Sequence, residues 1–349
     1  ILSTLRPSSG NITQTVYLIG DAVLLAAVTV HARLAGLETI IRAILIAAGL
    51  NVLLGYADLF AYWSGNVTAL DIIRNANYGI LAEVEINGVK RVIGSFPEAS
   101  VYGATSLVFL AFCTELWLRG LAPATTFALA MLSLAGVFLA LSSSAFFGLG
   151  AYFLLLWLRC TWKVSVGKAA RQEMAVFLGG PVVALTTVLL LALMPLMAER
   201  IADISDRLLF EKFDTASGIE RSLWNEYGMK ALWDSYLLGA GAGSIRTSSF
   251  TIAVLANTGI IGFALMSMYL LGMARAGLAP AANGGYGAYA AAAGWAMIAN
   301  LTVAAVAGGS MDLGLAFFVF SGVLAAAAAP VARRKPRAAA IHGNNYSYG

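Results

Sequence analysis

Apolar runs of about twenty residues recur along the whole chain, and they constrain its fold more than any other feature. Such runs can cross a bilayer as helices, which satisfy their backbone hydrogen bonds internally. Charged residues make up only 11% of the chain, well below the roughly 25% of soluble domains. The sequence therefore predicts an all-α polytopic membrane protein with about nine transmembrane helices. The predicted spans are 14–32, 43–63, 100–118, 123–142, 143–158, 174–197, 250–272, 284–309 and 311–329.

The spans divide the chain into alternating membrane and polar segments. In chain order the expected segments are 1–63 with two spans, 64–99 as a polar loop with a hairpin, 100–197 with four spans, 198–249 as a larger polar loop containing helices and a glycine-rich turn, 250–329 with three spans, and 330–349 as a basic and polar tail. Because the chain begins with Ile1 rather than Met, we expect further spans upstream of this fragment.

Basic residues are sorted by loop, which predicts the orientation of the chain. One set of loops and the tail carry Arg33, Arg42, Arg119, Arg159, Lys163, Lys168, Arg171, Arg275, Arg333, Arg334, Lys335 and Arg337. The positive-inside rule assigns these to the cytoplasm and the two long polar loops to the opposite side. The net charge of +4 therefore reflects topology, and it does not indicate nucleic-acid binding. Cys113 and Cys160 lie in different spans and suit neither a disulfide nor a metal site, and we expect no cofactor.

The first polar loop contains a hairpin signal. Asn87-Gly88 stands between alternating segments and suits a type I′ turn, which pairs Ile86 with Val89, Glu85 with Lys90 and Val84 with Arg91. This register places Arg91 on an apolar face, so we expect it to point toward the protein. Glu98 follows at the membrane surface, just before the third span.

The second polar loop carries the most distinctive turn. Residues 198–212 predict an amphipathic helix, and a capping box at 217–220 predicts a second helix through about Trp233. On the second helix Arg221 shares a face with Trp224, Asn225, Gly228 and Leu232. The glycine-rich turn then contains Gly239, Gly241, Gly243, Ser244 and Ser248, and Arg246 stands beside it.

Three arginines in these loops, Arg91, Arg221 and Arg246, are the predicted anion-binding residues. Guanidinium groups grip phosphate oxygens bidentately, so three of them suit a diphosphate. The alternative is that each arginine pairs with a neighbouring acid. Glu98 is the candidate general base, and its alternative is an ordinary interfacial acid.

Acids inside the spans bear on a transport function. Glu115 has Arg119 four residues on, which predicts a structural pair, and Asp58 and Asp312 fall near the ends of spans. Asp21 is the deepest acid, about 10 Å from the expected membrane edge. A lone deep acid is a weak transporter signal.

Three motifs together resemble the O-antigen ligase and polymerase superfamily, especially its exopolysaccharide polymerase branch. Arg91–Ser100 is similar to the segment that precedes a span in this family, and Ser142–Gly148 to a serine-rich hairpin start. The large periplasmic loop of the family and the helix after it are similar to three segments of this chain, Ser217–Arg221, Gly239–Ser249 and Leu255–Gly262. The resemblance implies a metal-independent glycosyltransferase of the bacterial inner membrane that uses polyprenyl-diphosphate-linked sugars at the periplasmic face. Its diphosphate-binding arginines map to Arg91 and Arg221, with Arg246 as a third.

One departure from the family pattern favours a polymerase. Ligases of the family carry a functional His after the glycine turn, where this chain has Ser248 and Ser249. The same departure leaves the general base unassigned by the resemblance, and Glu98 is preferred from its position before the third span. The expected catalytic set is then Glu98, Arg221 and Arg91. Its implied partners are a lipid-linked oligosaccharide, the bilayer, a flippase and a chain-length regulator. The alternatives are a ligase, a transporter or flippase of lipid-linked sugars, and a non-catalytic assembly subunit.

Overall fold

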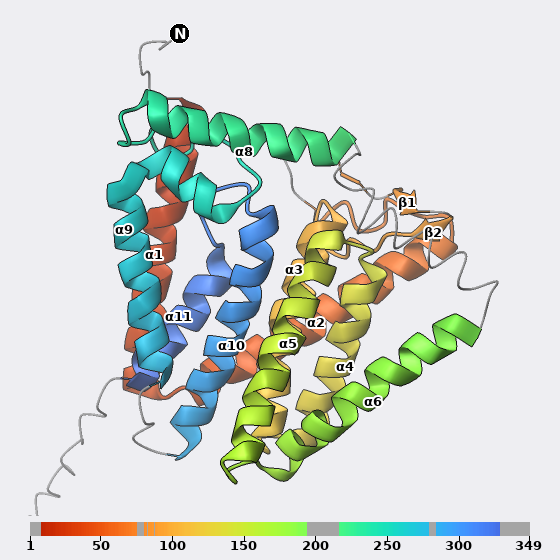
Figure 1. The fold of residues 1–349 in the computed structure, drawn as a ribbon. Helices are drawn as coiled ribbons and strands as arrows, with labels where there is room; N and C mark the ends of the chain where they lie inside the picture. The colour runs from red at the N-terminus through yellow and green to blue at the C-terminus, as the bar shows by residue number, and fades with distance from the viewer. Residues whose placement is uncertain are drawn as a thin grey trace, which may run out of the picture.

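The computed structural model describes residues 8–74, 80–81, 83–86, 88–193, 216–278 and 284–328. Within these ranges the chain forms ten helices and one two-stranded sheet of β1 (Glu85–Ile86) and β2 (Val89–Lys90) (Figure 1). A helix coincides with each predicted span. The helices are α1 (Ser9–Ala35), α2 (Glu38–Trp63), α3 (Ala99–Leu118), α4 (Pro123–Leu139), α5 (Ser143–Ser165), α6 (Arg171–Leu193), α8 (Ala216–Asp234), α9 (Phe250–Leu278), α10 (Gly284–Ala307) and α11 (Leu315–Ala328).

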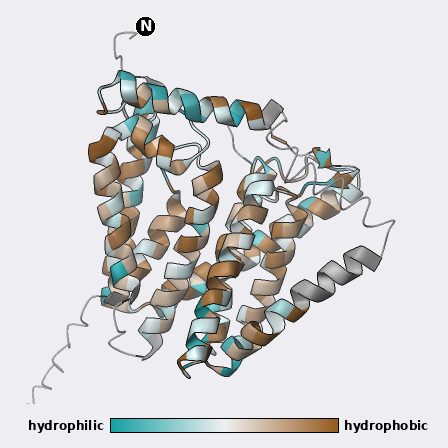
Figure 2. Cartoon of the chain, viewed as in Figure 1, coloured by the Kyte–Doolittle hydropathy of each residue, from teal (hydrophilic) through white to brown (hydrophobic). Residues whose placement is uncertain are grey.

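Six helices in the described part of the chain are long and apolar enough to cross a membrane, namely α1, α2, α3, α5, α9 and α10. Two further apolar helices, α4 and α11, are shorter. Figure 2 places hydrophobic residues along most of the upright helices and hydrophilic residues on α8 and in the loops. The protein is therefore a largely helical, multi-pass membrane protein, and six of the nine predicted spans meet this criterion of length and hydropathy.

The centre of the bundle is formed by α10 and α3. Helix α10 packs against α3, α5, α9 and α11, and α3 packs against α4 and α5. Alanine lets helices approach closely, and the buried face of α10 carries it at Ala292, Ala293, Ala296 and Ala299. On the outside of this core α1 packs along α11, where a Cβ at Gly322 would meet Val28.

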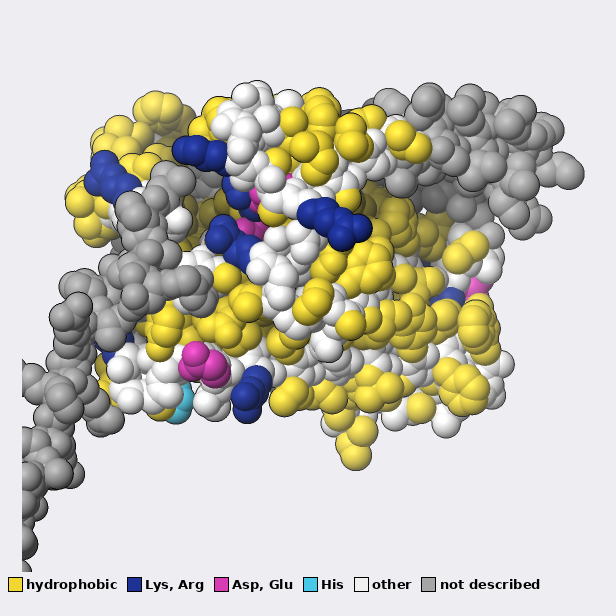
Figure 3. All heavy atoms as spheres, turned by 90° about the horizontal axis from the view of Figure 1, so that it is seen from below, with side chains coloured by type: hydrophobic (Ala, Val, Ile, Leu, Met, Phe, Trp, Pro, Cys, Tyr) yellow, Lys and Arg dark blue, Asp and Glu magenta, His cyan; other side chains and the backbone are white. Residues whose placement is uncertain are grey.

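The two ends of the bundle differ in composition. Helix α8 lies across one end, and the β1–β2 hairpin lies at that same end (Figure 1). The opposite end carries basic side chains at helix termini, including Arg33 of α1, Lys163 of α5 and Arg275 of α9. Seen from below, Lys and Arg side chains lie on this opposite face (Figure 3). That this face is cytoplasmic stays a prediction from the positive-inside rule.

Helix α9 corrects the predicted span at 250–272, because it is not one continuous helix. Gly259 has φ 65° and ψ −167°, which breaks α9 after its first turns. The break frees the carbonyls of Ala256 and Asn257, and these accept hydrogen bonds from the backbone N–H groups of Ala240 and Gly241 at 2.8 and 2.9 Å. Backbone polar groups buried in a bundle must find such partners.

Candidate functional site

The β1–β2 hairpin has the register that the sequence predicts. Glu85 lies opposite Lys90 and Ile86 opposite Val89 in an antiparallel pair. The backbone N–H of Arg91 donates to the carbonyl of Val84 at 3.1 Å, which extends the pairing by one residue on each strand. The Arg91 side chain is half-buried, as the apolar face of the hairpin predicts.

Arg91, Glu98 and Arg221 come together at the end of the bundle beneath α8, although two loops far apart in sequence supply them. Burial lowers the pKa of the Arg91 guanidinium, the Glu98 carboxylate opposes this shift, and the positive charge of Arg221 adds to it. Among the described residues, the Nε of Arg91 is buried and has no hydrogen-bond partner. The fold thus places two cations near each other and leaves a buried N–H donor without an acceptor.

Glu98 occupies the position just before α3. Its backbone is extended, at φ −147° and ψ 152°, and its side chain makes no capping hydrogen bond to the helix. An N-cap side chain normally satisfies one of the free N–H groups of the first turn. The Glu98 carboxylate is therefore not used to begin α3, and its charge acts on Arg91 instead.

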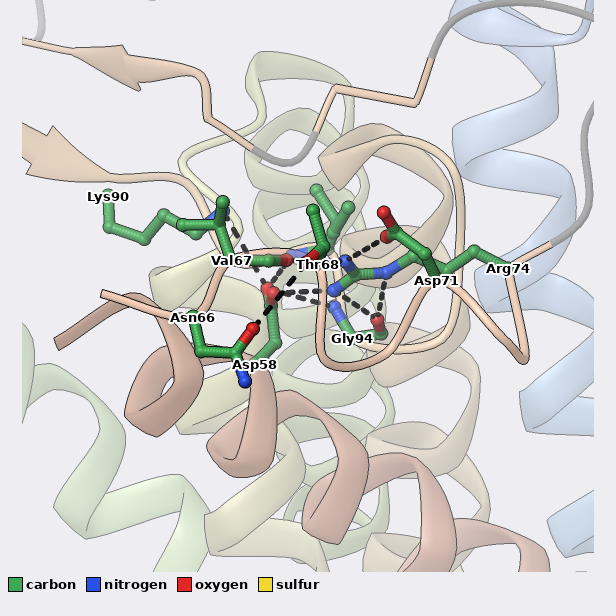
Figure 4. Close-up of polar contacts among 9 residues, drawn as sticks. Asp58, Asn66, Val67, Thr68, Asp71, Arg74, Lys90 and Gly94 are labelled. Carbon is green, nitrogen blue, oxygen red and sulfur yellow. Dashed lines mark hydrogen bonds and ion pairs between the residues drawn. The ribbon is translucent and has the colours of Figure 1, made fainter. Parts of the chain in front are cut away.

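A buried ionic clamp fixes the loop that carries Arg91 and Glu98 (Figure 4). Asp58, near the end of α2, is 2% exposed and accepts a hydrogen bond from Arg74 Nη2 at 2.5 Å. The other carboxylate oxygen of Asp58 accepts from the backbone N–H groups of Ile93 and Gly94, at 2.8 and 3.3 Å. The clamp therefore ties the segment directly after Arg91 to a membrane helix.

Arg74 completes the clamp from the other side of the loop. Its Nε and Nη2 donate to the carbonyl of Gly94 at 3.0 and 2.9 Å, and its Nη1 donates to Val67 and Asp71. A guanidinium with this many acceptors holds two backbone carbonyls and two carboxylates at fixed separations. Sequence reasoning placed Asp58 near the membrane edge but did not identify Arg74, because nothing local links two residues in different segments.

Lys90 is a second residue that the sequence did not single out. The residue is 4% exposed, and its Nζ lies 3.9 Å from the second carboxylate oxygen of Asp58 and 5.6 Å from the ring centroid of Tyr62. Burial lowers its pKa, and the charge of Asp58 opposes that shift. Successive side chains of a strand point to opposite faces, so a hairpin with Arg91 facing inward should have Lys90 facing outward. Lys90 is nevertheless buried, because it contacts α2.

The glycine-rich turn is held by two other segments, the start of α1 and the break in α9. Gly243 lies so close to α1 that a Cβ would be 2.5 Å from the carbonyl oxygen of Gly10. Asn11 Nδ2 donates to the carbonyl of Ala242 and to Ser244 Oγ, at 2.7 and 2.8 Å. Gly239 passes equally close to the break in α9, where its Cβ would be 2.5 Å from the backbone nitrogen of Gly259. The glycines therefore serve close backbone approach, and the turn is a rigid support for the residues that follow it.

Arg246 follows the turn and lies over Trp224 of α8, with 4.7 Å between the guanidinium carbon and the ring centroid. The face of α8 that the sequence grouped with Arg221 does face the bundle. Asn225 Oδ1 accepts from the backbone N–H of Ser248 at 2.8 Å, and Leu232 is 4% exposed. Arg221 and Arg246 are therefore positioned along one face of α8.

Other candidates are placed as follows. Glu226 is exposed on α8, away from the face that carries Arg221. Ser248 is buried and docks α8, while Ser244 is exposed. The predicted amphipathic helix at 198–212 lies outside the described residues. No group of three or more potential metal ligands from His, Cys, Asp and Glu occurs in the described part of the chain.

Comparison of the chain with protein-family models, with curated proteins and with solved structures found no match.

Proposed function

We propose that the protein is a bacterial polysaccharide polymerase of the inner membrane. It transfers a growing glycan from polyprenyl diphosphate onto a lipid-linked acceptor at the periplasmic face, where α8 lies. The observation that carries the proposal is the convergence of Arg91 and Arg221, with a buried Nε donor on Arg91 that has no acceptor among the described residues. Two guanidinium groups near each other suit an anion with several oxygens, such as a diphosphate.

In the proposed reaction, an acceptor hydroxyl oxygen attacks the anomeric carbon of the sugar bound to the diphosphate. A glycosidic bond forms, the bond between the anomeric carbon and the phosphate oxygen breaks, and the proton of the hydroxyl passes to Glu98. Arg91 and Arg221 stabilise the negative charge that develops on the departing diphosphate. Glu98 suits the role of base because its carboxylate lies close to Arg91 and does not cap α3.

The remaining loop residues suit substrate placement. Arg246 and Trp224 form a flat, charged pair beside Arg221, which suits the third contact to the diphosphate or the face of its first sugar. The Asp58–Arg74 clamp fixes the loop of Arg91 and Glu98 before any substrate binds. Positioning of this kind lowers the barrier without a covalent intermediate.

The test is polymerisation by full-length protein in nanodiscs supplied with a lipid-linked oligosaccharide. We expect a ladder of lengthened glycan that is unchanged by EDTA and lost in Arg91→Ala and Arg221→Ala. Arg33→Ala, at the opposite end of the bundle, is the matched control and should keep the ladder. A wild-type ladder from folded Arg221→Ala protein would contradict the diphosphate role.

A transporter or flippase of the same lipid-linked sugar is the second candidate, and one observation favours it. Asp21 is 1% exposed within α1, and the carboxyl group of Asp312 is near enough to act on it electrostatically. The sequence pattern indicated that Asp21 is a lone deep acid. In the fold a second carboxyl group, that of Asp312, lies near it. Buried carboxyl pairs occur on proton pathways of transporters. Movement of the lipid-linked sugar across sealed vesicles, with no ladder from any lipid-linked unit, would favour this candidate over the polymerase.

A further inference from the structure

Asp21 differs from every other buried acid in the described part of the chain. Asp58, Glu115 and Glu173 each contact an arginine at 2.8 Å or less. Asp21 is 1% exposed and has no basic partner in the described ranges. The titratable group that acts on it is the neighbouring carboxyl group of Asp312.

The path of the chain between α10 and α11 explains how these acids meet. The connecting segment, 308–314, turns back beside α10, because Asn300 Nδ2 donates to the carbonyl of Leu313 at 3.4 Å. Asn300 lies two turns before the end of α10, about 10 Å along the helix axis. The segment therefore enters the bundle rather than staying at its end. Within it, the backbone N–H of Gly314 donates to Asp312 Oδ1 at 2.6 Å and orients the carboxyl group.

We propose that Asp21 and Asp312 form a proton-binding site in which the two carboxyl groups share one proton. Two adjacent carboxylates in a low-dielectric environment cannot both remain ionised. Asp21 Oδ2 is buried and has no donor among the described residues, so a shared proton supplies the hydrogen bond that it lacks. At the other buried acids an arginine supplies this hydrogen bond, and none of the arginines that the structure describes pairs with Asp21.

The groups that face the pair from neighbouring helices are uncharged. Tyr269 of α9 is close enough for the charge of Asp21 to act on its hydroxyl group, and the buried hydroxyl oxygen has no hydrogen-bond partner in the described ranges. Ser321 of α11 donates its hydroxyl to the carbonyl of Phe317 in its own helix. Asn300 of α10 binds the backbone of the connecting segment. No group in this set can replace the proton as a counter-charge.

The proton site joins the two segments that support the glycine-rich turn. On one side, Asn11 of α1 holds the turn through Ala242 and Ser244. On the other side, the carbonyl of Gly309 accepts from the backbone N–H of Thr247 at 3.4 Å. Ionisation of both carboxyl groups would push α1 and the connecting segment apart. The shared proton thus keeps both supports of the Arg246 segment in place.

The first test is infrared spectroscopy of the full chain in nanodiscs at pH 7, where exposed Asp and Glu are ionised. We expect a protonated-carboxyl C=O band that shifts in D2O and disappears in Asp21→Asn, because the new amide donates to Asp312. Asp234→Asn, an exposed acid at the end of α8, is the matched control and should keep the band. A wild-type protein without the band, or an unchanged band in Asp21→Asn, would overturn the proposal.

The second test is thermal unfolding as a function of pH. The folded chain holds a proton that the unfolded chain releases above the ordinary Asp pKa of about 3.9. Because the folded state then binds more protons, the free energy of unfolding falls as pH rises. We expect this fall to be smaller in Asp21→Asn than in wild type and in Asp234→Asn. Equal slopes in all three proteins, or stabilisation of the wild type by sodium in place of protons, would refute a proton site. Neither test depends on glycosyltransferase activity.

Discussion

The end of the bundle opposite α8 and the end beneath α8 differ in how completely their charged side chains are paired. At the opposite end, Glu115 accepts from Arg119 and Arg159 at 2.8 and 2.5 Å, and Glu173 accepts from Arg159 and Lys163 at 2.8 and 2.5 Å. This network joins α3, α5 and α6. The predicted pair of Glu115 with Arg119 is confirmed there.

Beneath α8, pairing is divided between two neighbouring clusters. The Asp58–Arg74 clamp is as fully bonded as the network at the opposite end. Two residues before Ile93, Arg91 keeps a buried Nε that has no partner among the described residues, and it lies near a second cation, Arg221. Saturated ion pairs hold elements together, whereas incompletely paired cations that converge require an external anion to offset their repulsion. The comparison therefore separates structural charges from the candidate ligand-binding charges.

Breaking the network at the opposite end should have the largest effect on stability. Glu115→Gln removes the shared acceptor of two arginines, and we expect a loss of about 3–5 kcal/mol in the free energy of unfolding. Thermal unfolding in detergent measures this loss. Glu38→Gln, an exposed acid in the first turn of α2, is the control and should cost about 1 kcal/mol or less. Equal stability of Glu115→Gln and wild type would remove the structural assignment.

Breaking the clamp should combine a stability loss with a binding loss. Asp58→Asn leaves Arg74 buried without its counter-charge, so we expect destabilisation of about 3 kcal/mol. Because the clamp positions the loop of Arg91, folded Asp58→Asn protein should also bind polyprenyl diphosphate more weakly. Folded Glu115→Gln protein should keep wild-type affinity. Equal affinities of the two folded variants would show that the clamp does not position the site.

Glu98 and Glu226 provide a matched pair of acids on the α8 side. Glu98→Gln should lower the polymerisation rate by about 10²–10⁴-fold, the usual contribution of a general base. Glu226→Gln, on the exposed side of α8, should leave the rate near wild type. Initial rates from the glycan ladder make the comparison. The reverse order of damage would exclude Glu98 as the base.

Arg91→Lys should introduce a pH dependence. Burial lowers the pKa of a cation at this position, and lysine begins from an ordinary value near 10.4 whereas arginine begins above 12. The lysine variant should therefore lose its charge, and its activity, as pH rises into the alkaline range, while wild type stays charged. Parallel pH profiles for the two proteins would contradict a buried, charge-dependent role for Arg91.

Loss of the contact between Arg246 and Trp224 should have the smallest effect on activity. Its contact with Trp224 is exposed, and a cation–π pair of this kind contributes about 0.5–1 kcal/mol. Trp224→Ala should therefore raise the KM for the lipid-linked donor by about two- to five-fold, with kcat nearly unchanged. A large loss of kcat would contradict a role in substrate placement alone and would show that Arg246 and Trp224 act in the chemical step.

Local sequence patterns predicted the helices and the hairpin but not the contacts between distant segments. Apolar runs located the spans because each run must bury itself in lipid or in the bundle. Asn87-Gly88 predicted the pairing of Ile86 with Val89 because turn chemistry sets the register. The break of α9 at Gly259 was missed, since it depends on the approach of the glycine-rich turn.

The candidate site was predicted in part for the same reason. The positions of Arg91, Glu98 and Arg221 followed from loop motifs, and the fold brings these three together. The sequence did not predict that Asp58 pairs with Arg74 or that Asp21 lies near Asp312. Both contacts depend on how distant segments pack together, and no local spacing of residues indicates them. Lys90 shows where the alternating pattern of a hairpin fails to predict burial. The hairpin alone would expose Lys90, but its side chain is buried beside the Asp58 carboxylate of α2.

The most direct test of the account is ligand-induced thermal stabilisation of the full chain by polyprenyl diphosphate, with uncharged polyprenol as the matched ligand. At a hundred times Kd, the diphosphate should stabilise wild type by about 2.7 kcal/mol, and polyprenol should give much less. The account predicts that the diphosphate-specific part is lost in the double variant Arg91→Ala, Arg221→Ala and kept in Arg33→Ala. Equal stabilisation by both lipids, or full stabilisation of the double variant by the diphosphate, would contradict an anion site formed by these two arginines.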